Sequence, residues 1–331
     1  MNIVRVALAV PLPRFFDYLY PPNLMPIVGG RVLVPFGSQK RVGIVVDLPA
    51  SSDVAKEKLK PIIDVLDAES LFNSTTWDWL AWSANYYRAA LGDVLFQALP
   101  VKLRNGESAV KNDRTFWRIT DLGKQALESG ELKRAKKQIE ALNLLLTEDL
   151  EKGNNEISSA IWSALKGKDY VEEIIVPTEQ KSWQQALGDN PLVNLDNRLT
   201  LNKQQALAFS QLLFQEGFNV WLLEGVTGSG KTEIYLQYIE EILKKGKQVL
   251  VLVPEIGLTP QTVRRFKARF NVEIDVLHSN LNDTQRLNVW ERARTGQSAI
   301  VIGTRSALFT QFSDLGLIIL DEEHDGSFKQ Q

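Results

Sequence analysis

Apolar and polar positions divide the chain into three segments with different periods. Residues 1–105 carry short runs rich in β-branched residues, and these runs predict strands over 4–10, 30–36 and 41–48. Prolines and glycines separate the runs, as expected of turns. Apolar side chains at helical spacing then predict a helix over 75–88. The first segment is therefore predicted to be a β-rich domain.

The second segment, residues 106–176, is predicted to be mainly helical. Periodic apolar residues favour helices over 133–146 and 156–165, and a β-branched run predicts a strand over 169–176. Helices followed by a strand hairpin are the order of a winged helix. Residues 106–200 hold 13 basic and 16 acidic residues, so this domain is expected to act as a hinge or protein contact rather than a strong DNA binder.

Residues 177–200 are rich in turn formers and are predicted to be a linker. The third segment, residues 201–331, alternates apolar runs with helical patterns, which is typical of a parallel sheet covered on both faces. The predicted strands are 220–224, 248–253, 273–277, 299–302 and 317–320. The fold class is therefore multidomain α/β.

A phosphate-binding loop is the clearest motif, because the chain matches G-x-x-x-x-G-K-[ST] between a strand and a helix. The matching residues are Gly225, Val226, Thr227, Gly228, Ser229, Gly230, Lys231 and Thr232. Glycines let backbone N–H groups turn toward phosphate oxygens, and the helix N-terminus adds positive potential. Lys231 is predicted to reach the β- and γ-phosphates of ATP, and the Thr232 hydroxyl to bind Mg²⁺. A glycine-rich turn that matches by chance is the alternative.

Carboxylates follow the last apolar strand, at the edge where α/β proteins hold ligands. Asp321 is predicted to bind Mg²⁺, and Glu322 to act as the general base that activates water. Two adjacent acids favour hydrolysis over transfer to an acceptor hydroxyl. His324 is expected to couple this site to neighbouring elements, with an ordinary surface histidine as the alternative. An exposed acidic loop is the alternative for the whole segment.

Composition narrows the function further. The 331 residues include no cysteine, which excludes disulfides, cysteine nucleophiles and cysteine zinc sites in this chain and fits a cytoplasmic protein. No apolar run is long enough for a transmembrane helix, so no membrane partner is expected. The formal net charge is -2, so any DNA binding must come from local patches.

The motifs of the third segment resemble those of superfamily 2 helicases of the DExH type. The box at 321–324 is similar to DExH, while PEIGLTPQ at 254–261 and GTRSA at 303–307 resemble motifs that contact a DNA strand. Such helicases place an adenine-reading glutamine just before the phosphate loop, and Gln205 is the expected reader with Gln204 as its competitor. The DNA-contacting residues that the resemblance implies are Thr259, Gly303, Thr304 and Arg305.

The combination of these motifs is similar to the PriA family of replication-restart helicases. Segments 10–18 and 30–37 resemble the fork-binding domain of that family, so the resemblance covers 6–331. It implies a RecA-like first helicase lobe over 201–331 and a pocket for a DNA 3′ end in residues 1–105. The implied pocket residues are Phe16, Asp17, Gly37 and Lys60. An aromatic suits base stacking and a carboxylate suits a 3′-hydroxyl, whereas a core aromatic is the alternative for Phe16.

The resemblance implies an ATP-dependent 3′-to-5′ DNA helicase that recognises stalled or branched forks and starts primosome assembly. Its cofactors are ATP and Mg²⁺, with zinc expected only in a C-terminal part that would follow together with a second lobe. Its implied partners are branched and single-stranded DNA, primosome proteins and single-strand-binding protein. The alternatives are a fork-binding fragment with little ATPase, and a different superfamily 2 DNA translocase.

Overall fold

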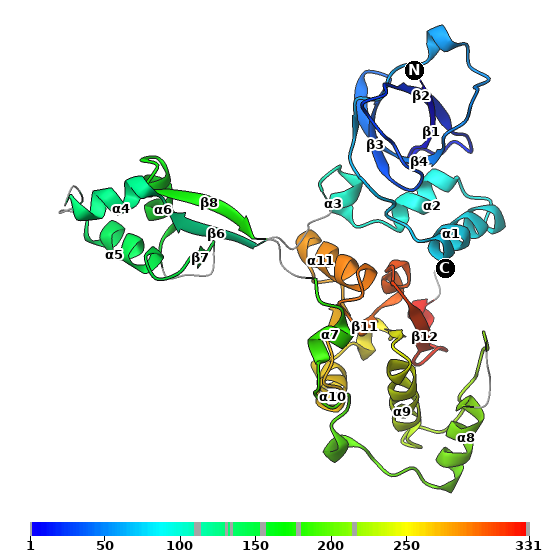
Figure 1. Cartoon of the computed structure of the whole chain (residues 1–331). Coiled ribbons are helices and arrows are strands. Elements are labelled where there is room, and N and C mark those ends of the chain that lie inside the picture. Colours follow the sequence, from blue (N-terminus) through cyan, green and yellow to red (C-terminus); the bar gives the residue numbers. More distant parts are fainter. Residues whose placement is uncertain are drawn as a thin grey trace. The chain divides into compact units, whose positions relative to one another are not determined.

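The computed structural model describes residues 2–108, 114–129, 132, 135–152, 157–176, 180–213 and 217–328. Two compact units make up the chain: residues 1–109 together with 181–331, and residues 110–180. The chain therefore leaves the first unit, forms the second and returns to the first. Figure 1 shows the elements of both units, coloured along the sequence.

A five-stranded sheet forms the N-terminal part of the first unit, with the strand order β2-β1-β4-β3-β5 and antiparallel pairs throughout. The strands are β1 (Asn2–Ala7), β2 (Phe16–Tyr20), β3 (Arg31–Phe36), β4 (Gln39–Asp47) and β5 (Asp64–Val65). Side chains alternate across each strand, so the valines at 4 and 6 of β1 and at 32 and 34 of β3 are all buried in the shared core. The three predicted strands are present, whereas β2 escaped prediction because Asp17 interrupts its apolar run.

Three helices follow the sheet: α1 (Ser74–Tyr86), α2 (Leu91–Gln97) and α3 (Val101–Arg104). Asn73 caps α1, because its side chain accepts a hydrogen bond from the Thr76 N–H at 2.8 Å. The buried cluster beneath these helices also takes in side chains from a much later helix, α11 (Asp283–Arg294). Its members include Leu80, Leu95, Leu99, Leu103, Leu287 and Trp290.

Polar contacts join the same two regions. The Gln311 side chain donates to the Leu71 carbonyl at 2.6 Å, and this bond is buried. The Asn73 side chain donates to the Phe312 carbonyl at 2.9 Å. Trp79 and Phe309 place their ring centroids 5.8 Å apart. The helical segment that follows the N-terminal sheet and the C-terminal region thus share an interface made of both apolar packing and hydrogen bonds.

The second unit holds a three-stranded antiparallel sheet with the order β7-β6-β8 and three helices. Its elements are β6 (Arg114–Ile119), α4 (Asp121–Glu128), α5 (Lys136–Leu145), β7 (Leu150–Glu151), α6 (Ser159–Lys166) and β8 (Val171–Val176). Trp117 and Trp162 stack in its core with ring centroids 5.3 Å apart. β6 precedes the helices and was not predicted. Lys133 and Glu156, the expected first residues of two helices, lie outside the described residues, as does Pro177.

A four-stranded parallel sheet with the order β10-β11-β9-β12 forms the C-terminal part of the first unit. The strands are β9 (Gln248–Leu252), β10 (Ile274–Leu277), β11 (Ile300–Gly303) and β12 (Leu315–Leu320), and the helices are α8 (Lys203–Leu213), α9 (Lys231–Lys244), α10 (Pro260–Arg269) and α11. All five residues of β9 are buried, as expected of a central parallel strand. Four of the five predicted strands are therefore present.

The fifth predicted strand, 220–224, is absent: these residues belong to no helix or strand. Val220 is 83% and Leu222 75% exposed. The physical reason is that a strand needs a hydrogen-bonded neighbour. Within the described part of the chain β12 pairs only with β9, and its outer edge leaves Ile318 49% exposed. Residues 220–224 do not pair with this free edge, so their apolar side chains stay exposed.

The segment predicted as a linker packs on the parallel-sheet region instead from residue 181 onward. Ser182 caps the short helix α7 (Trp183–Leu187) through a capping box with Gln185. Trp183 and Val193 are buried in the core of that region, and Val193 pairs with Phe270. From residue 181 onward, the turn formers thus lie in a folded segment rather than in a free connection. Among the described residues, no helix has the length and apolar character that crossing a membrane requires.

Candidate nucleotide and DNA-binding site

The phosphate loop leads directly into α9, which begins at Lys231. Gly228 has φ 80° and Gly230 φ 84°, a left-handed conformation that glycine adopts without a Cβ penalty. The Lys231 ammonium donates to the Gly225 carbonyl across the loop. This arrangement presents the N-terminus of a 14-residue helix and one cation to the same small space. Both features favour an anionic ligand.

Gln205 reaches this loop from α8. Its side-chain amide donates to the Ser229 carbonyl at 2.8 Å, while its oxygen accepts from the Asn202 N–H, also at 2.8 Å. A Cβ on Gly230 would lie 2.3 Å from the Gln205 amide nitrogen, so only glycine allows this approach. Gln204 is exposed. The structure thus brings Gln205, the expected residue, to the loop, and not its competitor Gln204.

Asp321 lies at the carboxyl end of β12, where its N–H donates to the Leu252 carbonyl at 2.9 Å. The Tyr235 hydroxyl donates to one oxygen of the Asp321 carboxylate at 3.1 Å. Thr232 lies three residues before Tyr235 on α9, so the two side chains share one face of that helix. The Tyr235 hydroxyl therefore ties Asp321 to the helix that carries Thr232, the other residue predicted to hold Mg²⁺.

Tyr235 is a site residue that the sequence analysis missed. Burial and the nearby negative charge of Asp321 raise the pKa of the Tyr235 hydroxyl, so it remains a donor at neutral pH. The available signal was its spacing, because residues three apart share one face of a helix. Thr232 contributes a hydroxyl and Asp321 a carboxylate, and oxygen ligands of this kind suit Mg²⁺.

Replacing Tyr235 by phenylalanine is expected to weaken magnesium-dependent nucleotide binding by about three- to tenfold, because Asp321 loses a donor worth about 0.5–1.5 kcal/mol that orients it. Titration of Mg²⁺ against a fluorescent ATP analogue measures the effect. Tyr238→Phe, on the same helix, is the matched control and should change nothing. An unaltered magnesium requirement in Tyr235→Phe would show that Asp321 needs no such support.

Glu322 adopts a left-handed backbone conformation, with φ 51°, that non-glycine residues seldom hold. Such strain costs about 1–3 kcal/mol and is concentrated at functional sites. The side chain is exposed, and its carboxylate lies 3.7 Å from the Nε2 of His324, which is exposed as well. The structure thus places Glu322 and His324 together beside Asp321. Their roles as general base and coupling residue stay predictions.

The predicted DNA-contacting motifs lie at the same edge of the sheet. Thr259 caps α10 by accepting from the Thr262 N–H at 3.2 Å. Gly303 ends β11, and a Cβ there would lie 2.5 Å from that of Ala307, so the turn that follows requires glycine. Thr304 and Arg305 open the short 3-10 helix η4 (Arg305–Phe309). The Arg305 guanidinium donates to the Ser327 carbonyl at 3.4 Å, which joins this motif to the acidic segment.

The N-terminal candidate residues take different positions around β2, and their common pocket stays a prediction. Phe16 packs edge-on against Phe36 with ring centroids 5.2 Å apart, and Gly37 follows Phe36 in an open turn at φ 61°. Asp17 points to the other face of β2, because neighbouring strand residues alternate. The Lys60 side chain is exposed, and its carbonyl accepts from the Leu19 N–H.

Asp17 is already paired. The Arg5 guanidinium donates to both carboxylate oxygens, at 2.8 and 3.0 Å, and the Ser52 hydroxyl donates to one of them at 2.6 Å. The hydrogen bond from Arg5 holds the pKa of the Asp17 carboxyl below its usual 3.8. A carboxylate has about four acceptor positions, so one remains for a further donor.

Because the folded state lowers this pKa, the pair stabilises the domain above pH 3.8 and the stabilisation is lost as the pH falls through the lower folded-state value. We expect Asp17→Asn to lower the free energy of unfolding by about 1 kcal/mol near neutral pH, a modest value because solvent screens the partly exposed Arg5. Denaturant unfolding from pH 7 down to the acid limit tests this, and Glu57→Gln is an exposed control. A difference that persists at the acid limit would contradict the assignment.

Comparison with known proteins shows which family has sequences similar to this chain. A family model described as a 3′ DNA-binding domain matches residues 5–100, and one described as a DEAD/DEAH box helicase matches residues 202–331. Replication restart protein PriA of Haemophilus influenzae is 76% identical over 331 residues, which is 100% of this chain and 45% of that protein. The protein of the same name from Buchnera aphidicola (subsp. Acyrthosiphon pisum) is 35% identical over 99% of this chain and 45% of its own length.

A third relative, replication restart protein PriA of Bacillus subtilis, is 29% identical over 100% of this chain and 50% of its own length. The chain thus spans about half the length of the curated relatives it matches. The two matched regions coincide with the two parts of the first structural unit. One of these parts holds Phe16, and the other holds the phosphate loop. From the sequence matches and the two family models together, the chain belongs to the PriA family of replication restart proteins.

Proposed function

We propose that this protein is an ATP-dependent 3′-to-5′ DNA helicase that recognises stalled or branched replication forks and initiates primosome assembly. The observation that carries the proposal is the convergence of Gln205, Thr232, Tyr235 and Asp321 around one phosphate loop. This loop shares a structural unit with the region that matches a 3′ DNA-binding domain. Primosome proteins and single-strand-binding protein are the proposed protein partners.

In the proposed ATP site each residue has a distinct task. Lys231 and the N-terminus of α9 neutralise the charge of the β- and γ-phosphates, and Gln205 reads the adenine. Thr232 and Asp321 hold Mg²⁺, which supplies charge neutralisation at the phosphates when bound. Glu322 orients the attacking water and accepts its proton. Arg305, hydrogen-bonded to the acidic segment, connects the hydrolytic residues to the bound DNA strand.

In the N-terminal domain, the ring pair of Phe16 and Phe36 and the carboxylate of Asp17 recognise different parts of a DNA end. Arg14 lies over the Phe16 ring at 5.0 Å, and Arg41 over the Phe36 ring at 5.5 Å. Cations beside aromatic faces suit both the bases and the phosphates of a single strand. The remaining acceptor position of Asp17 takes the hydrogen of a terminal 3′-hydroxyl.

A fork that ends in a 3′-hydroxyl is expected to bind about tenfold more tightly than one that ends in a 3′-phosphate, because the phosphate removes the donor and repels the Asp17 carboxylate. Fluorescence anisotropy with two otherwise identical forks measures the ratio. Asp17→Ala should reduce the ratio to about one, whereas Glu57→Gln should preserve it. Equal affinity of the unmodified protein for both ends would exclude the proposed end recognition.

A further inference from the structure

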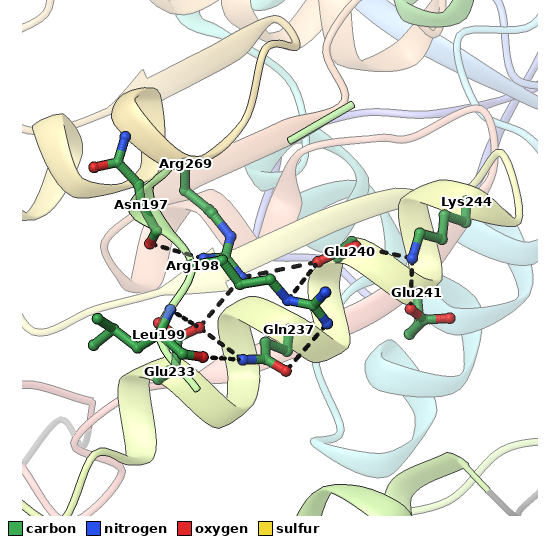
Figure 2. A network of polar contacts seen from close by, with 9 residues as sticks. All are labelled: Asn197, Arg198, Leu199, Glu233, Gln237, Glu240, Glu241, Lys244 and Arg269. Atoms are coloured by element: carbon green, nitrogen blue, oxygen red, sulfur yellow. Dashed lines mark hydrogen bonds and ion pairs between the residues drawn. The ribbon is translucent and has the colours of Figure 1, made fainter. Parts of the chain in front are cut away.

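A buried network of charged side chains joins α9, α10 and the chain just before α8 (Figure 2). Arg269, at the end of α10, is 1% exposed and lies at its centre. One guanidinium nitrogen donates to the Asn197 carbonyl at 2.8 Å, and another donates to the Glu233 carboxylate at 3.2 Å. The same nitrogen lies 3.8 Å from Glu240. Both glutamates come from α9, the helix that begins in the phosphate loop.

The network binds the backbone of residues 197–199, here called the strap. The Leu199 N–H donates to Glu233 at 3.3 Å, and the Leu199 carbonyl accepts from the Gln237 amide at 2.9 Å. Together with the Arg269 bond to Asn197, three backbone groups of the strap are held by side chains of α9 and α10. Figure 2 shows these bonds converging on the strap from both helices.

The network is poorly suited to stability alone. Within the described part of the chain, the Nε of Arg269 and one oxygen of Glu240 are buried without a hydrogen-bond partner. Each such atom lacks the hydrogen bond that would offset its desolvation, and apolar residues of similar volume often replace buried ion pairs without loss of stability. The hydrogen bonds of the charged network instead fix the position of the strap along α9.

The position of the strap matters for the nucleotide site. The chain runs from Leu199 into the Asn202 cap and then to Gln205, whose amide reaches the Ser229 carbonyl at 2.8 Å. Glu233 and Gln237 of α9 bind the Leu199 end of this stretch of chain, while Lys231, at the start of the same helix, belongs to the phosphate loop. The network and the phosphate loop are thus both attached to α9, with the chain from Leu199 to Gln205 running between them.

We propose that Arg269 is a positioning residue for nucleobase selection: by holding the strap on α9 it keeps Gln205 within reach of the adenine of a bound ATP. The inference rests on the proposed ATP site with Gln205 as its adenine reader. Arg269 touches no nucleotide in this scheme, so its effect appears in the discrimination between bases rather than in the affinity for the phosphates.

The test uses methylanthraniloyl derivatives of ATP and GTP, whose dissociation constants are measured by fluorescence titration with the 331-residue chain. Arg269→Met is expected to lower the preference for ATP over GTP by about tenfold, the effect of one lost hydrogen bond. Gln237→Met removes the donor to Leu199 at smaller structural cost and should lower the preference in the same direction. Thermal unfolding of each variant confirms that it is folded.

Arg292→Met is the matched control, since Arg292 pairs with Glu273 and Asp275 at 2.8 and 2.9 Å in the same lobe and not with the strap. It should retain the preference of the parent chain. Gln205→Ala should abolish the preference. If Gln205→Ala abolishes it while folded Arg269→Met and Gln237→Met both retain it, the inference is overturned and the proposed site stands. A parent chain without any preference would overturn both the adenine-reading role of Gln205 and the inference.

Discussion

Replacement of Lys231 by alanine is expected to weaken ATP binding by about ten- to a hundredfold and to abolish hydrolysis, while affinity for forked DNA stays unchanged. The structure places this ammonium across the phosphate loop, where it donates to the Gly225 carbonyl. Charge-assisted hydrogen bonds of this kind contribute about 1.5–3 kcal/mol. Fork recognition is assigned to residues 5–100, which share no residue with the loop. Nucleotide titration and fork anisotropy on the same preparation measure both properties.

Lys245→Ala is the control for this experiment, because Lys245 is an exposed cation at the opposite end of α9. It should leave ATP binding, hydrolysis and fork binding at the level of the parent protein. A loss of fork affinity in Lys231→Ala without any nucleotide present would contradict the separation of the two tasks.

Glu322→Gln is expected to reduce ATP turnover by about 10²–10⁴-fold while ATP binding is retained, the range associated with loss of a general base. The amide keeps the size and shape of the side chain but accepts a proton far less readily. The left-handed backbone at this position, φ 51°, imposes the same strain on glutamine as on glutamate, so the local fold should persist. Steady-state hydrolysis and nucleotide titration separate turnover from binding.

Glu323→Gln is the adjacent control, since Glu323 is also exposed but lies one residue further from Asp321. It should keep turnover within a few-fold of the parent protein. Turnover retained in Glu322→Gln and lost in Glu323→Gln would transfer the role of general base to Glu323.

The phosphate loop and the acidic strand end were predictable because their chemistry resides in contiguous residues. Lys231 and Thr232 follow glycines whose spacing is typical of the backbone of a phosphate loop. Asp321 follows an apolar run that is typical of a buried strand. The preference for Gln205 over Gln204 rested on the resemblance alone, because the residue of the first turn of α8 that faces the loop depends on the fold. Tyr235 escaped notice because its partner Asp321 is 86 positions away in the chain.

The N-terminal pocket was less predictable for the same reason. Phe16 and Asp17 are adjacent in the sequence, which suggested one site, but strand alternation separates their side chains. The pairing of Asp17 with Arg5 depends on the β1–β2 register, in which these two residues face each other. Segment 220–224 has the composition of a strand, yet composition cannot supply the neighbouring strand that it needs.

The interface between helices α1–α3 and the parallel-sheet region has a consequence for biosynthesis. Asn73 bonds to Phe312 across 239 positions of sequence, and Gln311 bonds to Leu71 across 240. At a translation rate of about 5–20 residues per second, the ribosome needs roughly 12–48 s to make the second partner after the first. During that interval the nascent sheet domain exposes the apolar surface of α1 and α2 that Leu287 and Trp290 later cover. A nascent chain of this protein is therefore expected to recruit a holdase chaperone at that surface until α11 has been synthesised.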